Sequence, residues 1–167
     1  MKKLIISSTI LSICLILIQT SLFSHIPFFL ITADLLLVYI TFVAINNGSR
    51  FAMIIGFLSG LFLDFMSLSP LGLSSFILTF ISFFLGKLYG RYNLTHFIFP
   101  FLLTLIATFA KVFLLILLSF LFGSSIKTYS FYENSFWIEL ILNLTFSPII
   151  FFTLNRFPRF FKSMRDV

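Results

Sequence analysis

The segment GLFLDFMSLSPLG, residues 60–72, places one carboxylate, Asp64, at the end of a strongly apolar run and follows it with a short polar turn. Gly56 and Gly60 precede Asp64 at intervals of four residues. Residues four apart are neighbours on one face of a helix, so these three share a face. We therefore predict that a helix ends here with its small, polar face turned toward other helices.

The turn after Asp64 predicts where the next helix begins. Ser69 and Pro70 have the pattern of a helix N-cap followed by proline at the first helical position, and Gly72 follows shortly after. The segment thus predicts two helices joined by a tight corner.

The composition indicates an integral membrane protein. The chain of 167 residues is 60% hydrophobic and 10% charged, with a mean hydropathy of +1.16. A soluble domain carries about 25% charged residues. A chain with so few charges exposes too much apolar surface for water, which indicates that its helices lie in a lipid bilayer. We expect one helical domain, residues 1–167, without a separate soluble domain.

Six apolar segments are candidates for transmembrane helices: about 4–23, 33–47, 51–66, 71–89, 97–122 and 136–155. The second and third are shorter than the roughly 20 residues of a full crossing, so we expect them to tilt or to be shielded by protein. The first follows two lysines, as in a signal peptide. It is longer than a typical signal core and no A-x-A-like site follows it, which favours an uncleaved helix.

The basic residues predict the orientation. Six crossings put both termini, the second-to-third connection and the fourth-to-fifth connection on one side. That side then holds nine of the eleven lysines and arginines: Lys2, Lys3, Arg50, Lys87, Arg91, Arg156, Arg159, Lys162 and Arg165. Short cytoplasmic loops are rich in Lys and Arg, so we predict an all-α polytopic bundle with both termini in the cytoplasm.

Lys111 is the deepest charge within a predicted span. A charge at the centre of a bilayer costs roughly 2.5–3.5 kcal/mol on insertion scales, so it needs a partner. Three acids fall toward the outer half of the membrane: Asp34, Asp64 and Glu139. A buried ion pair that fixes helix packing and a path for a proton, ion or substrate are both consistent with this pattern.

The two aspartates meet opposite ends of helix dipoles. Asp34 opens its helix and faces the positive end, whereas Asp64 closes its helix and faces the negative end, which is unfavourable. Asp64 therefore needs another partner, either free amides in the turn at 66–71 or Lys111.

The chain has no motif for catalysis, metal or cofactor binding. It lacks the H-E-x-x-H, G-x-S-x-G and phosphate-loop patterns, and it has a single cysteine, Cys14. The histidines, His25 and His96, fall on opposite sides of the predicted bundle. We expect no enzymatic activity, no cofactor, no metal site and no nucleic-acid partner.

Residues 33–86 resemble the MreD family of rod-shape-determining proteins. The resemblance rests on an acid opening the second helix, a GxxxGxxxD helix, a short loop and PLG, carried here by Asp34, Gly56, Gly60, Asp64, Pro70, Leu71 and Gly72. Ala33 stands where the family usually has proline. The segment FWIELILNLTFSPIIFFTLNR resembles the family's last helix through Phe136, Trp137, Asn143, Pro148 and Arg156.

This resemblance implies a non-catalytic scaffold of the bacterial lateral wall-elongation complex in the cytoplasmic membrane. Its implied partners are an MreC-like membrane protein and, through it, MreB-like filaments and the wall-synthesising glycosyltransferase and transpeptidase. The six-helix plan also resembles the substrate-binding membrane component of energy-coupling-factor vitamin transporters. In that alternative, Lys111 and the outer acids would line a substrate pocket.

Overall fold

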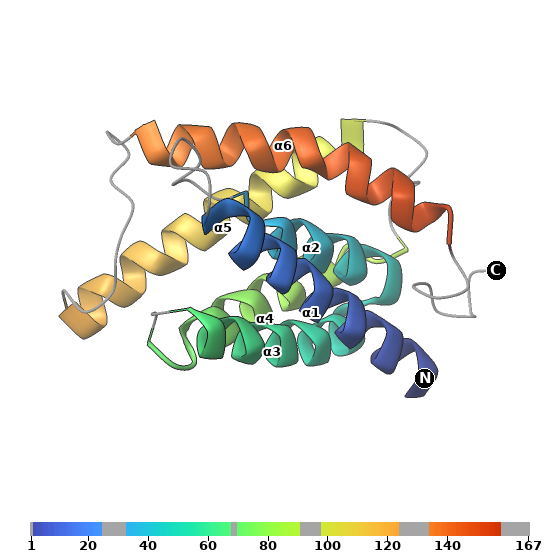
Figure 1. Ribbon diagram of the computed structural model, residues 1–167, viewed down its shortest axis with the longest axis horizontal. Coiled ribbons are helices and arrows are strands. Elements are labelled where there is room, and N and C mark those ends of the chain that lie inside the picture. Colours follow the sequence, from blue (N-terminus) through green and yellow to red (C-terminus); the bar gives the residue numbers. More distant parts are fainter. Residues whose placement is uncertain (1, 25–32, 68–69, 91–97, 124–133, 158–167) are drawn as a thin grey trace.

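The computed structural model describes residues 2–24, 33–67, 70–90, 98–123 and 134–157. In these ranges the regular elements are six helices: α1 (Lys2–Ser24), α2 (Leu35–Asn47), α3 (Ser49–Met66), α4 (Leu73–Gly86), α5 (Ile98–Phe122) and α6 (Asn134–Asn155) (Figure 1). The predicted all-helical plan with six helices is confirmed.

Helix α2 is the centre of the bundle. Every residue from Leu35 to Asn46 is buried, and α2 contacts all five other helices. Its 13 residues span about 20 Å, less than the roughly 30 Å of a bilayer core. The surrounding helices therefore separate this short helix from lipid, which is the shielded arrangement expected from its length.

Within the described residues, three helices are long and apolar enough to cross a membrane: α3, α5 and α6. Within α1 the apolar segment Leu4–Thr20 is shorter, as are α2 and α4, so six crossings stay a prediction. The start of α1, the junction of α2 with α3 and the end of α6 lie at the same end of the molecule, as six crossings require (Figure 1). Four of the basic residues assigned to that side lie outside the described residues: Arg91, Arg159, Lys162 and Arg165.

Large apolar side chains cover the outside of the bundle, as expected for lipid-facing helices. Phe65 of α3, Phe120 of α5 and Phe152 of α6 are 71%, 89% and 76% exposed. The inward faces carry small and polar side chains, as predicted for the face of α3; Ser8, Ser12 and Ser82, for example, are fully buried.

Helices α3 and α4 lie side by side as an antiparallel hairpin with very close backbone contact (Figure 1). A Cβ atom on Gly60 would lie 2.4 Å from Cα of Ser75, and one on Gly86 would lie 2.4 Å from Cα of Ser49. A Cβ atom on Gly56 would lie 2.6 Å from Oγ of Ser82. The two glycines of the GxxxG pattern therefore pack within the chain.

The predicted start of α4 was wrong. Pro70 and Gly72 belong to a turn in which the amide of Leu73 donates to the carbonyl of Pro70 (3.2 Å), and α4 begins only at Leu73. Gly72 has φ 91° and ψ −11°, which are the angles of the third residue of a type II turn and cannot continue a helix. Ser69, the predicted N-cap, lies outside the described residues.

Candidate functional site

The ten candidate residues fall into two groups of contacts. Five of them, which we call the corner group, lie in the α3–α4 hairpin: Gly56, Gly60, Asp64, Pro70 and Gly72. The other five, the network group, lie on α5 and α6 and at the start of α2: Asp34, Lys111, Glu139, Asn143 and Pro148.

Asp64 closes the corner by capping the next helix. Its carboxylate is buried and accepts hydrogen bonds from the amides of Gly72 (2.9 Å) and Ser74 (3.0 Å) and from the hydroxyl of Ser75 (3.4 Å). Asp64 thus faces the negative end of its own helix but also the positive end of α4, and the second interaction offsets the first. Among the described residues the backbone partners lie at the start of α4, directly after the predicted turn at 66–71.

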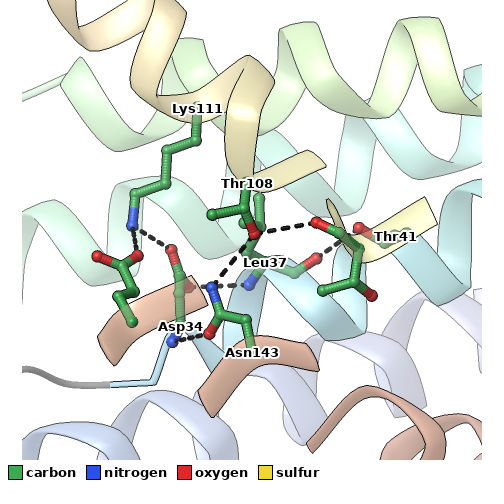
Figure 2. Close-up of polar contacts among 8 residues, drawn as sticks. Asp34, Leu37, Thr41, Thr108, Lys111 and Asn143 are labelled. Atoms are coloured by element: carbon green, nitrogen blue, oxygen red, sulfur yellow. Dashed lines mark hydrogen bonds and ion pairs between the residues drawn. The ribbon is translucent and has the colours of Figure 1, made fainter. Parts of the chain in front are cut away.

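Lys111 joins the network group through two ion pairs. Its Nζ atom lies 2.7 Å from Oδ2 of Asp34 and 2.7 Å from Oε1 of Glu139 (Figure 2). Two of its three predicted partners are therefore confirmed. Of the two kinds of partner considered for Asp64, backbone amides are observed, and both ion pairs found in the described part of the chain join Lys111 to the other acids.

Asp34 connects three helices at the start of α2. Its Oδ1 accepts from the amide of Leu37 (2.9 Å), so Asp34 caps α2 at the positive end of the helix dipole, the place predicted for it. Its own amide donates to Oδ1 of Asn143 on α6 (2.7 Å), while its second oxygen holds Lys111 on α5 (Figure 2). The ion pair with Lys111 and the hydrogen bond from the Leu37 amide explain how this carboxylate is accommodated with a side chain only 9% exposed.

Three rungs of polar contacts join the antiparallel helices α5 and α6, and we call them the polar ladder. The rungs are Lys111 with Glu139 (2.7 Å), Thr108 with Asn143 (3.4 Å) and Thr104 with Ser147 (2.6 Å). The residues are three or four apart on α5 and four apart on α6, so each set lies on one helix face. In lipid, polar side chains that bond across helices hold those helices together.

Pro148 stands directly after the last rung. Proline has no amide hydrogen, so the usual helical bond to the carbonyl of Leu144 is missing inside α6. Its neighbour Ser147 donates across to the carbonyl of Pro100 at the start of α5 (2.9 Å). The two prolines therefore lie near one inter-helix hydrogen bond.

The sequence did not identify Tyr39 as a structural residue. This tyrosine is fully buried in α2, and its hydroxyl donates to the carbonyl of Ser8 in α1 (3.1 Å). A tyrosine inside a largely apolar helix is itself a signal, because a buried phenol needs a hydrogen-bond partner.

The polar contacts of the network group hold neighbouring helices together. Among the described residues no group of three or more His, Cys, Asp or Glu side chains is arranged to hold a metal ion. His25 and His96 lie outside the described residues. Breaking a buried ion pair from one side leaves an uncompensated charge, so Lys111, Asp34 and Glu139 fix the positions of α2, α5 and α6 against one another.

Comparison with known proteins gives one family. The sequence model of the family described as rod shape-determining protein MreD matches residues 1–157. The match extends over segments that the motifs in residues 33–86 and the last helix do not reach. No curated protein and no solved structure matches the chain.

Proposed function

The chain belongs to the MreD family of rod shape-determining proteins, and from that membership we propose that it is a non-catalytic scaffold of the complex that builds the lateral wall of rod-shaped bacteria. In this role it crosses the cytoplasmic membrane six times with both termini inside. Its bundle presents lateral surfaces to partner helices and couples cytoplasmic filaments to wall synthesis outside.

The observation that carries the scaffold role, beside the family, is how the polar side chains inside the bundle are used. Asp34, Lys111 and Glu139 bond to one another, and Asp64 caps α4. A rigid bundle is what a scaffold needs, because partner surfaces on different helices must keep fixed relative positions.

The partners we propose are an MreC-like membrane protein by direct contact and, through it, MreB-like filaments and the wall-synthesising glycosyltransferase and transpeptidase. Exposed apolar faces on α5 and α6, including Phe120 and Phe152, offer room for a partner's transmembrane helix as well as for lipid.

The experiment combines depletion with co-purification. Cells of a rod-shaped bacterium that depend on this chain are depleted of it, and cell width is measured with and without expression of the wild-type chain. We expect depleted cells to widen and round, and the affinity-tagged chain to co-purify with the MreC-like protein. Normal width after depletion would contradict the scaffold role.

The same experiment tests the transporter alternative. A transporter component would co-purify with an ATPase module or a vitamin, and its loss would create a nutrient requirement at normal cell width. The ammonium of Lys111, which that alternative assigns to substrate, already bonds to two carboxylates, and this favours the scaffold.

A further inference from the structure

Helix α4 carries an exposed stripe of aromatic rings that the scaffold role does not use. Phe76, Phe80 and Phe84 follow one another at intervals of four residues, with ring centroids 6.0 Å and 4.7 Å apart. Phe83 lies edge-on to Phe84 at 5.4 Å. All four rings are between 37% and 51% exposed, and we call them the aromatic stripe.

A cation is held over one end of this stripe. The Nζ atom of Lys87 lies 4.3 Å from the ring centroid of Phe83 and 5.4 Å from that of Phe84, distances at which a cation is attracted to an aromatic face. Among the described residues both ion pairs belong to Lys111, so Lys87 has no carboxylate partner there. Its charge is therefore positioned next to the rings and open to an anion.

A second exposed cation lies at the same end of the hairpin. Gly86 packs against the backbone of Ser49, and the Ser49 hydroxyl donates to the carbonyl of Phe83 (3.2 Å). Arg50 and Lys87 are the next residues along the chain from this contact, and both are exposed. The excess of basic residues assigns this end to the cytoplasmic side.

We propose that the aromatic stripe and Lys87 form a binding site for an anionic phospholipid of the inner leaflet. The phosphate pairs with Lys87, assisted by Arg50, at the level of the headgroups, and an acyl chain lies along the rings of Phe84, Phe80 and Phe76. A zwitterionic lipid brings no net charge to this end. A second copy of the chain packed in parallel on the stripe would bring two Lys87 ammonium groups together, which is unfavourable.

The test is native mass spectrometry of the full-length protein purified from membranes that contain equal amounts of phosphatidylglycerol and phosphatidylcholine. We expect the wild type to retain phosphatidylglycerol preferentially. Lys87→Gln is expected to lower that preference about fivefold, the contribution of one basic residue near an anionic surface. Phe80→Ala is expected to lower the amount of bound phosphatidylglycerol while the thermal midpoint stays close to that of the wild type.

Arg156→Gln is the matched control, because Arg156 is an exposed cation directly after the end of α6, at the same end of the bundle but away from α4. Its preference should equal that of the wild type. If Lys87→Gln and Arg156→Gln lower the preference for phosphatidylglycerol equally, or if the wild type shows no such preference, the proposed site is contradicted. Equal losses would mean that all the basic residues at this end attract anionic lipid without a specific site. The variant Phe80→Cys with Cys14→Ser has its single cysteine on the aromatic stripe, so a second copy packed there would form a disulfide-linked dimer. We expect no such dimer in membranes, and efficient dimer formation would contradict the lipid site.

Discussion

Gly60 of α3 lies so close to Ser75 of α4 that there is no room for a side chain at position 60. A Cβ atom there would be 2.4 Å from Cα and 2.6 Å from the backbone nitrogen of Ser75. Both are backbone atoms, so the overlap is relieved only by moving the two helices apart. The corner at Asp64 and the glycine contact thus belong to one hairpin whose helix spacing is set by the absence of side chains.

The first prediction concerns Gly60→Ala. We expect it to lower the free energy of unfolding by about 3 kcal/mol, the upper end of the range for overpacked cores, because no flexible side chain can yield. The measurement is the unfolding midpoint in detergent.

Gly56→Ala and Ile54→Ala serve as graded controls on the same helix. A Cβ on Gly56 first meets the Ser82 hydroxyl, which can rotate away, and then the Leu78 carbonyl at 3.0 Å, so we expect a smaller loss. Ile54 is 48% exposed, and its truncation should change stability by no more than about 0.5 kcal/mol. Equal stability of Gly60→Ala and Ile54→Ala would contradict the close approach.

The second prediction concerns Asp64 as the cap of α4. Asp64→Leu removes both acceptors of the Gly72 and Ser74 amides, and we expect a loss of about 2 kcal/mol or more. Asp64→Asn keeps one acceptor oxygen and should lose about 1 kcal/mol. Hydrogen exchange at the Gly72 and Ser74 amides should accelerate in Asp64→Leu before the rest of α4 is affected; unchanged protection there would show that the cap is not needed.

Much of the fold follows from short-range patterns in the sequence. Hydropathy alone places the six helices, and Gly48 and Gly123, both with positive φ, directly follow the ends of α2 and α5. The spacing of four residues identifies the inward faces. The N-cap role of Asp34 follows from its place at the positive end of a helix dipole.

Contacts between distant segments did not follow from the sequence. Lys111 lies 77 positions from Asp34 and 28 from Glu139, and the three acids have similar predicted depths, so depth does not select among them. The prediction of where α4 begins was wrong for a related reason. The amide of Ser74 is capped by Asp64, ten positions earlier, whereas local rules consider only residues adjacent to the helix start.

The third prediction separates the partners of Lys111 by double-mutant cycles. Lys111→Met leaves two neighbouring carboxylates without their cation, and we expect a loss of about 3–5 kcal/mol. Adding Glu139→Gln should recover part of this loss, with a coupling energy of about 1–3 kcal/mol. Lys111→Met combined with Asp64→Leu should instead be additive within about 0.5 kcal/mol. Strong coupling between Lys111 and Asp64 would contradict the assignment of the ion pairs.

The fourth prediction tests the Thr104–Ser147 rung of the polar ladder. Ser147→Ala removes the bonds to Thr104 and to the Pro100 carbonyl, and we expect a loss of about 0.6–1.7 kcal/mol, the range measured for such bonds between membrane helices. Thr145→Ala is the matched control, since Thr145 is exposed on the same helix and bonds only to its own turn at Ile141 (2.8 Å). The unfolding midpoints of the two variants are compared, and equal effects would show that the rung adds nothing across the helices.

The fifth prediction concerns membrane orientation. Nine of the eleven basic residues share one side when the six helices alternate in direction, and the start of α1 and the end of α6 lie at the same end of the bundle (Figure 1). A reporter enzyme that is active only outside the cytoplasm should therefore stay silent when fused after Val167. The same reporter fused after Gly123, at the end of α5, should be active, which controls for expression and export. Activity at both positions would mean that α6 does not cross, because α6 is the only described helix between them. A silent fusion after Gly123 together with an active one after Val167 would mean that one of the first five helices does not cross, and the short, fully surrounded α2 would be the first to examine.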